Sequence, residues 1–235
     1  MELASKNWDV IVIGGGPAGL ASAVAAHDKG ARVCIIEREE RPGGILKQCI
    51  HDGFGVVRFK EKLTGPEYAY RVIEMAKERQ IPIYLNSFLT DITYHNGIYD
   101  LALVNNEEGA FYAKAPSIVM AMGCRERTDR QVFIQGDRPS GIMTAGLAQY
   151  FINIQGYMPT KKCVILGSGD IGLIMARRLT LEGAEVEGVY EILPEPSGLT
   201  RNVVQCLEDY NIPLHLGTTV TEVHGKNRVE GVTVA

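Results

Sequence analysis

The order of apolar and polar positions predicts a strand, a tight turn and a helix near the start of the chain. Val10–Ile13 is a short apolar run of the kind found in buried parallel strands. It runs directly into Gly14-Gly15-Gly16-Pro17-Ala18-Gly19 and then into an alanine-rich segment, residues 20–26, which we expect to be helical. Gly30 is placed to end this helix, and residues 31–36 form the next apolar strand.

The same order of elements begins again at residue 162. An apolar run, residues 163–166, precedes Gly167-Ser168-Gly169-Asp170-Ile171-Gly172, a helical pattern over 173–181 and a strand over 184–190. The two copies also share an Ile-Pro strand start, at Ile81 and at Ile212. A repeat of this length predicts an α/β chain built from two related domains.

Between the copies the pattern predicts one more helix and a small sheet. Thr64-Gly65-Pro66-Glu67 is a capping box that opens a helix to about residue 79, with Tyr70, Ile73 and the stem of Lys77 along one face. Alternating segments at 89–94, 99–104 and 109–113 indicate a β-meander, and residues 118–122 a buried strand.

The turn-rich residues 125–140 are typical of a connector, with Gly136 to Gly141 expected to join two domains. A short helix should follow from Thr144 to about residue 155, where Gly156 stops it.

The first glycine turn has the residues needed to hold the pyrophosphate of a dinucleotide. Gly14 permits a sharp turn, Gly16 a close approach of the phosphates, and Gly19 close packing of helix on strand. Pro17 suits the first helical turn, and the unpaired N–H groups there favour negative charge. Glu37, about 20 residues beyond the glycines, is placed to accept hydrogen bonds from an adenosine ribose.

Composition narrows the classes of function. The chain is 46% apolar and 22% charged with a net charge of -4, which gives no basic field for nucleic acid. No apolar run reaches the length that crosses a bilayer. The five cysteines form no C-x-x-C pair, which argues against a disulfide framework or a thiolate metal site and fits a cytoplasmic protein.

With these motifs the chain resembles the flavoproteins with two dinucleotide-binding domains of glutathione-reductase type, the pyridine nucleotide-disulfide oxidoreductase superfamily. The segments Gly-Gly-Ile-Leu-Lys-Gln-Cys-Ile-His-Asp-Gly-Phe-Gly and Gly-Ser-Gly-Asp-Ile-Gly resemble a narrower branch. That branch comprises NAD/FAD-dependent dehydrogenases associated with glycerol 3-phosphate metabolism, akin to the large subunits of opine and sarcosine oxidases.

The resemblance implies an α/β fold of two Rossmann-like, three-layer ββα domains, the second incomplete. We expect residues 1–125 to form the first part of an FAD-binding domain, 126–158 a connector with a short helix, and 159–235 an NAD-binding domain that stops before its closing strand. Family members continue beyond this point, so the chain is expected to be a fragment or one part of a split enzyme; the alternative is a naturally short protein whose NAD domain is complete as it stands. The exposed edges would be covered by a missing C-terminal portion, a partner subunit or a second copy.

The resemblance also assigns site residues. The cofactor-binding residues expected for FAD and NAD are Gly14, Gly16, Pro17, Ala18, Gly19, Glu37, Arg38, Gly43, Gly44, Leu89, Gly123, Gly167, Gly169, Asp170, Gly172 and Glu191. Lys47, Cys49 and His51 would lie near the flavin as catalytic residues, and no metal site is expected. Met122 stands where the family usually has threonine.

The leading hypothesis is an FAD-dependent oxidoreductase that exchanges a hydride with NAD(H) and passes electrons to a small-molecule substrate or a partner subunit. Neither family position for a redox-active cysteine pair is filled, which excludes internal dithiol exchange. One alternative is a peroxidase or oxidase that uses Cys49 alone; another is an auxiliary dinucleotide-binding subunit that is inactive without its partner. Packing or hydrogen bonding within the loop is an equally good account of Cys49 and His51.

The second site is expected to prefer NADH to NADPH, because the Glu191 carboxylate would repel a 2′-phosphate. No arginine or lysine follows immediately to hold such a phosphate. The spacing from Gly183 to Glu191 is one residue longer than from Gly30 to Glu37, which suggests a bulge at Gly188.

Overall fold

The computed structural model describes residues 5–235 and divides into two compact units, the first ending at Cys124 and the second spanning Arg125–Ala235. The centre of the first unit is a parallel sheet with strand order β10-β2-β3-β6. Its strands are β2 (Val10–Ile13), β3 (Val33–Ile36), β6 (Ile83–Tyr84) and β10 (Ser117–Met120). All four were predicted from the apolar runs.

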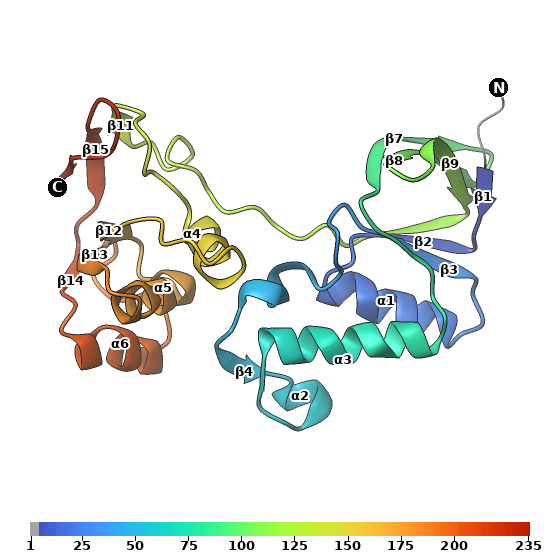
Figure 1. Cartoon of the computed structure of the whole chain (residues 1–235), viewed down its shortest axis with the longest axis horizontal. Helices are drawn as coiled ribbons and strands as arrows, with labels where there is room; N and C mark the ends of the chain where they lie inside the picture. The colour runs from blue at the N-terminus through green and yellow to red at the C-terminus, as the bar shows by residue number, and fades with distance from the viewer. Residues whose placement is uncertain (1–4) are drawn as a thin grey trace. The chain divides into compact units, whose positions relative to one another are not determined.

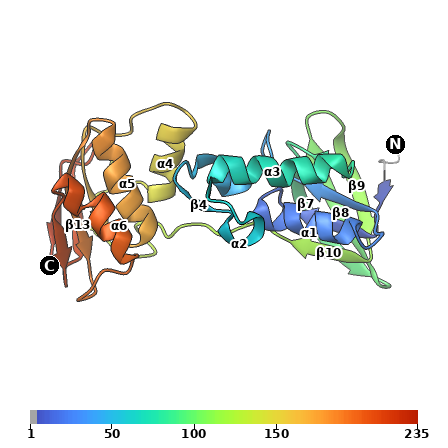
Figure 2. The same ribbon diagram turned by 90° about the horizontal axis from the view of Figure 1, so that it is seen from below.

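Two helices, α1 (Pro17–His27) and α3 (Gly65–Glu78), cover one face of this sheet and lie side by side (Figures 1 and 2). Their core with the sheet includes Leu20, Val24 and Val72. The side chain of Tyr70 on α3 is 64% exposed. Small residues such as Ala69 and Ala76 face inward instead, because α1 and α3 approach closely.

The predicted meander covers the other face of the parallel sheet (Figure 1). It consists of β7 (Phe88–His95), β8 (Ile98–Asn105) and β9 (Gly109–Ala115), with the short parallel strand β1 (Ser5–Asn7) beside β9. Leu101, Leu103 and Phe111 pack against Ile11 and Ile13 between the two sheets. Two sheets and a helical layer give the three-layer ββα architecture.

The segment between β3 and α3 is more regular than its glycine content suggested. It forms the 3-10 helix η1 (Gly44–Gln48), the hairpin strands β4 (Asp52–Phe54) and β5 (Leu63–Thr64), and the one-turn helix α2 (Val56–Phe59). The capping box at Thr64 is confirmed, since Thr64 Oγ1 accepts from the N–H of Glu67 and the Glu67 carboxylate accepts from the N–H of Thr64.

The second unit repeats the first in its parallel sheet and adjoining helices. The sheet has the order β12-β13-β14, from β12 (Lys162–Leu166), β13 (Glu185–Glu191) and β14 (Leu214–Leu216). Around it lie α4 (Ala145–Asn153), α5 (Asp170–Leu181), α6 (Thr200–Cys206) and the 3-10 turn η2 (Glu208–Tyr210). The core contains Leu173, Val189 and Leu207.

The predicted bulge is present. Cys163 pairs with Val186 but Val164 with Gly188, so β13 carries one additional residue at this point and Glu191 still ends level with Leu216.

The residues expected to connect the domains belong to the second unit. Strand β11 (Gln135–Gly136) pairs with β15 (Val220–His224), which in turn pairs with β16 (Gly231–Val234). Gly136 has φ +89, and a side chain there would overlap the carbonyl of Val223. Gly136 is therefore needed for close pairing of β11 with β15.

The two copies differ at one edge of the parallel sheet. In the first unit β10 lies beside β2, whereas within residues 5–235 no strand occupies the corresponding side of β12. The predicted fold class, α/β with Rossmann-like dinucleotide-binding domains, is confirmed. No helix in the described part of the chain is long and apolar enough to span a membrane.

Candidate functional site

The first glycine loop joins β2 to α1 and leaves the start of the helix open. A Cβ at Gly19 would overlap the carbonyl oxygen of Gly14, and a Cβ at Gly14 would overlap that of Ala121. Gly14 has φ +106, and Pro17 occupies the first turn of α1. Within residues 5–235 no side chain caps this helix, so its first N–H groups face the loop in the geometry that binds phosphate.

Glu37 lies at the carboxyl end of β3 and fixes the middle of the loop. Its carboxylate is buried; Oε2 accepts from the N–H of Gly15 over 2.6 Å and Oε1 from the N–H of Glu39 over 2.8 Å. A carboxylate has about four lone-pair sites, so two remain for the hydroxyl groups of a ribose.

The double glycine lies against this loop. The N–H of Gly43 donates to the carbonyl of Gly15 over 2.7 Å. Gly43 and Gly44 have φ values of +117 and +55, and a Cβ at Gly44 would lie 2.9 Å from Cα of Gly16. The first half of the chain therefore places two glycine backbones together where a cofactor can lie flat against them.

Lys47 and Cys49 are held by structural contacts. The Lys47 ammonium pairs with Glu39 and donates to the carbonyl of Arg41 over 2.8 Å, so it fastens the segment that follows Glu37. Cys49 is 5% exposed, its carbonyl accepts from the N–H of Gly65 over 2.9 Å, and burial raises the pKa of its thiol. A buried neutral thiol is a poor nucleophile, which counts against the single-cysteine hypothesis.

His51 has one ring nitrogen in use and one unpaired. Nδ1 lies 3.0 Å from the carbonyl oxygen of Asp52, which can only accept, so Nδ1 carries the proton of the neutral ring. Nε2 is buried and has no hydrogen-bond partner among the described residues. The ring packs against Phe54, with ring centres 5.2 Å apart. His51 therefore presents an unused acceptor at Nε2.

The second glycine loop repeats the first in its backbone contacts. The N–H of Ser168 donates to Glu191 Oε2 over 3.0 Å, and the N–H of Leu193 donates to Oε1 over 3.0 Å. Gly169 begins α5 with no side-chain cap from the described chain, and a Cβ at Gly172 would lie 2.7 Å from the Gly167 carbonyl. Both loops thus combine a tight turn, an open helix start and a buried glutamate.

The Glu191 carboxylate accepts two hydroxyl hydrogen bonds in addition to the two backbone bonds that it shares with Glu37. Oε2 also accepts from the Ser168 hydroxyl over 2.6 Å and the Ser197 hydroxyl over 3.1 Å. Burial alone would raise the pKa of Glu191, but these bonds and the two backbone bonds outweigh burial and lower it to about 2. The carboxylate is therefore negatively charged throughout the physiological range.

Asp170 holds a loop, although we expected it to bind a cofactor. Its Oδ1 accepts from the N–H of Leu199 and from the side chain of Asn202, each over 2.8 Å. A Cβ at Gly198 would lie 2.7 Å from the Ser168 carbonyl, so residues 197–202 pack directly on the second glycine loop. Sequence reasoning missed Ser197 and Asn202, because nothing local marks contacts with residues about 30 positions away.

The remaining predicted cofactor residues lie at the ends of strands or beside the meander. Arg38 is exposed after β3, Leu89 is half-buried in β7, and Gly123 has φ +73 after β10. Cys34 and Cys206 are buried, and burial raises the pKa of the Cys34 thiol to about 12. Residues 5–235 contain no group of three or more His, Cys, Asp or Glu side chains arranged to hold a metal ion.

Comparisons with known proteins agree with this geometry. Residues 8–235 match the family model described as pyridine nucleotide-disulphide oxidoreductase. Among curated proteins, the hydrogen cyanide synthase subunit HcnB of Pseudomonas protegens is 28% identical over 248 residues, covering 96% of this chain and 50% of that protein. An opine oxidase subunit from Agrobacterium tumefaciens is 27% identical over 195 residues, covering 76% of this chain and 36% of that protein.

Among solved structures, the thioredoxin reductase of T. acidophilum has a TM-score of 0.73 and 22% identity, over 97% of this chain and 70% of that one. This likeness shows the fold. The chain spans half or less of the length of the two curated relatives described above. The predicted kinship with opine and sarcosine oxidase subunits is confirmed by sequence matches to both.

Two dinucleotide-type glycine loops, each with a buried glutamate, and a family match over residues 8–235 lead to one assignment. The chain belongs to the pyridine nucleotide-disulphide oxidoreductase family, a family of flavoprotein oxidoreductases.

Proposed function

We propose that this protein is an FAD-dependent oxidoreductase that exchanges a hydride with NAD(H) and passes electrons to a small-molecule substrate or a partner subunit. The observation that carries the proposal is the duplicated loop. In each unit a backbone N–H of the loop donates a hydrogen bond to a glutamate carboxylate, beside a helix start that no side chain of the described residues caps. The pairs are Gly15 with Glu37 and Ser168 with Glu191. Two such sites suit an enzyme that binds two dinucleotides.

The first loop fits FAD. Gly14, Gly16 and Gly19 leave the approach to α1 clear, and Glu37 keeps two acceptor sites for the adenosine ribose. Gly43 and Gly44 extend the backbone surface beyond the pyrophosphate site. The flavin supplies the redox chemistry when it is bound.

The second loop fits NAD(H). The fully charged Glu191 carboxylate supports binding of a ribose with a free 2′-hydroxyl and opposes a 2′-phosphate. Its Oε1 accepts one bond, from the N–H of Leu193, and so retains an acceptor site. We assign Asp170 to positioning residues 197–202 around this site.

His51 is the proposed proton acceptor. Its Nε2 lone pair is fixed in place by the Nδ1 bond to Asp52 and by packing on Phe54. A ring nitrogen held in this way can accept a proton from a substrate while the substrate gives up a hydride. Lys47 acts as a positioning residue, since its ammonium group is bound to Glu39 and Arg41.

A partner subunit is part of the proposal. The curated relatives with the matches given above are named as subunits of hydrogen cyanide synthase and opine oxidase. This favours a second candidate, an auxiliary subunit that binds both dinucleotides and turns over only in a complex.

The test is the visible absorption spectrum of the purified full-length protein before and after anaerobic NADH. We expect bound FAD, and loss of its oxidised absorption on reduction. A folded protein that binds no FAD, or whose FAD is not reduced by NADH, would contradict the proposal. Flavin that NADH reduces but that reoxidises only when a second protein is added would favour the auxiliary subunit.

A further inference from the structure

The one-turn helix α2 presents two valines to solvent. Val57 is 86% exposed and Val56 is 53% exposed, and none of the four residues of α2 is fully buried. Adjacent apolar side chains with such high exposure, at the tip of an ordered segment, are typical of surfaces that bind another molecule. We call Val56 and Val57 the α2 tip.

The chain holds the α2 tip in one orientation. Gly55 before the helix and Lys60 after it both have left-handed backbone conformations, with φ values of +84 and +57. The flanking strands pair Asp52 with Thr64 and Phe54 with Leu63. Phe59 packs edge-on against Tyr68 of α3, with ring centres 5.3 Å apart. A preorganised tip loses little conformational entropy on binding.

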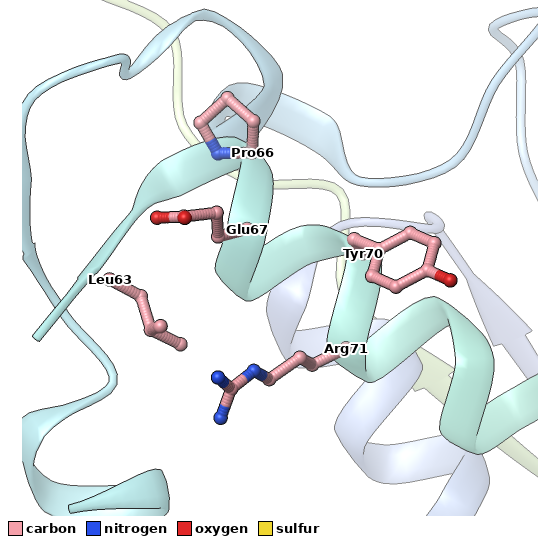
Figure 3. Close-up of a pocket in the computed structure, with 5 residues that line it drawn as sticks. All are labelled: Leu63, Pro66, Glu67, Tyr70 and Arg71. Carbon is pink, nitrogen blue, oxygen red and sulfur yellow. The ribbon is translucent and has the colours of Figure 1, made fainter. Parts of the chain in front are cut away.

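A pocket lies next to the α2 tip. It has a volume of about 390 Å³ and is lined by Leu63, Pro66, Glu67, Tyr70 and Arg71. Figure 3 shows Glu67 and Arg71 projecting from α3 on the side of Leu63. Arg71 pairs with Glu61 over 2.6 Å, and a Cβ at Gly55 would lie 2.9 Å from Leu63. Leu63 and Glu61 therefore connect the pocket to the hairpin that carries the α2 tip.

The charged side chains around the α2 tip indicate what kind of surface would bind there. Among the described residues, the carboxylates of Glu61 and Asp52 are paired with Arg71 and Lys62. Arg58 stacks on Phe59 and contacts the Met75 sulfur, and neither Arg58 nor Lys60 forms an ion pair with a described residue. Two copies of this chain would bring these cations together, so electrostatics opposes a symmetric dimer through the tip.

We propose that the α2 tip and the adjoining pocket bind the partner subunit, through an apolar surface of that subunit with an acidic rim. The valines supply the apolar centre, Arg58 and Lys60 face the acidic rim, and the pocket receives a protruding side chain. The inference rests on the proposed partnership.

The test places a photo-crosslinking amino acid at position 57 of the full-length protein in its native cells. Position 133 provides the matched control, since Phe133 is an equally prominent apolar side chain, 82% exposed. We expect one heterologous protein crosslinked from position 57 and not from 133. The adduct should be lost in Arg58→Glu with Lys60→Asp, because aspartate tolerates the left-handed backbone at residue 60.

The crosslinked protein is then purified, and its affinity is measured with and without the charge changes. We expect about a tenfold or greater loss of affinity in the double variant and weaker binding at higher salt. A self-adduct, binding only to vesicles of phosphatidylglycerol, or no adduct at all would overturn the proposal. FAD content and reduction by NADH, measured on the same variants, report separately on the proposed function.

Discussion

The backbone N–H of Ser168 donates to the carboxylate of Glu191 over 3.0 Å, 23 residues further along the chain. Gly15 makes the same bond to Glu37 over 2.6 Å, and in each copy the residue two positions after the glutamate donates to its other oxygen. The duplication thus extends to individual hydrogen bonds. What differs is the hydroxyl pair of Ser168 and Ser197, which belongs to the second copy alone.

Gly44→Ala should abolish stable FAD binding. The Cβ would meet Cα of Gly16 at 2.9 Å and push the double glycine away from the phosphate loop. Gly97→Ala is the matched control, because Gly97 also has a left-handed backbone, φ +83, but no described atom lies within 4 Å of its Cβ position. Both variants should lose about 1–2 kcal/mol of stability, and only the first should lose flavin absorption. Equal flavin content in the two would contradict this account.

Glu191→Gln should remove stability that depends on pH. The folded-state pKa of about 2 lies below the ordinary value of 4.5, so the stabilisation is complete above about pH 4.5 and is lost as the pH falls toward 2. The full effect is on the order of 3 kcal/mol. Thermal unfolding between pH 2 and 7 measures it, with the exposed Glu195→Gln as control. Parallel pH profiles for wild type and Glu191→Gln would show the prediction to be wrong.

Flavin reduction should be faster with NADH than with NADPH. The Glu191 carboxylate repels a 2′-phosphate, and a preference of about tenfold or more corresponds to one such unfavourable contact. Glu191→Gln should narrow the ratio, whereas Glu195→Gln should leave it unchanged. Stopped-flow absorbance measures the rate of flavin reduction by each nucleotide. Equal rates in the wild type would rule out the preference for NADH.

His51→Asn should slow substrate oxidation without loss of FAD. The asparagine amide can still donate to the Asp52 carbonyl, but it offers no acceptor in place of Nε2. We expect a fall of about a hundredfold in turnover and loss of the corresponding step in the pH–rate profile. His95→Asn, at an exposed position of β7, is the control. An unchanged pH profile would assign His51 a structural role.

Cys49 should resist alkylation in the native protein. Burial raises the pKa of its thiol, so little thiolate exists at neutral pH, whereas Cys124 is exposed. Mass spectrometry after treatment with iodoacetamide should find Cys124 modified well before Cys49, and Cys49→Ser should keep its activity. Rapid modification of Cys49 with loss of turnover would restore the single-cysteine hypothesis.

The local pattern of apolar and polar residues was sufficient to predict much of the fold. The apolar runs at Val10 and Cys163 predicted the two parallel sheets, and the extra residue before Glu191 correctly implied a bulge at Gly188. The pattern did not show which face of α3 is buried; close packing of α1 and α3 places small residues such as Ala69 and Ala76 there. The loop contacts of Asp170 could not be predicted, since its partners Leu199 and Asn202 become neighbours only in the folded chain.

The hairpin that carries α2 begins and ends at nearly the same place in the first unit, since Asp52 pairs with Thr64. The helix that follows is fixed independently, by the Thr64 capping box and by the bond from Gly65 to the Cys49 carbonyl. Such a closed excursion can change its length or sequence in evolution while the glycine loops stay in place. If the α2 tip binds the partner subunit as proposed, exchange of residues 53–63 would change the choice of partner and leave both glycine loops unaltered.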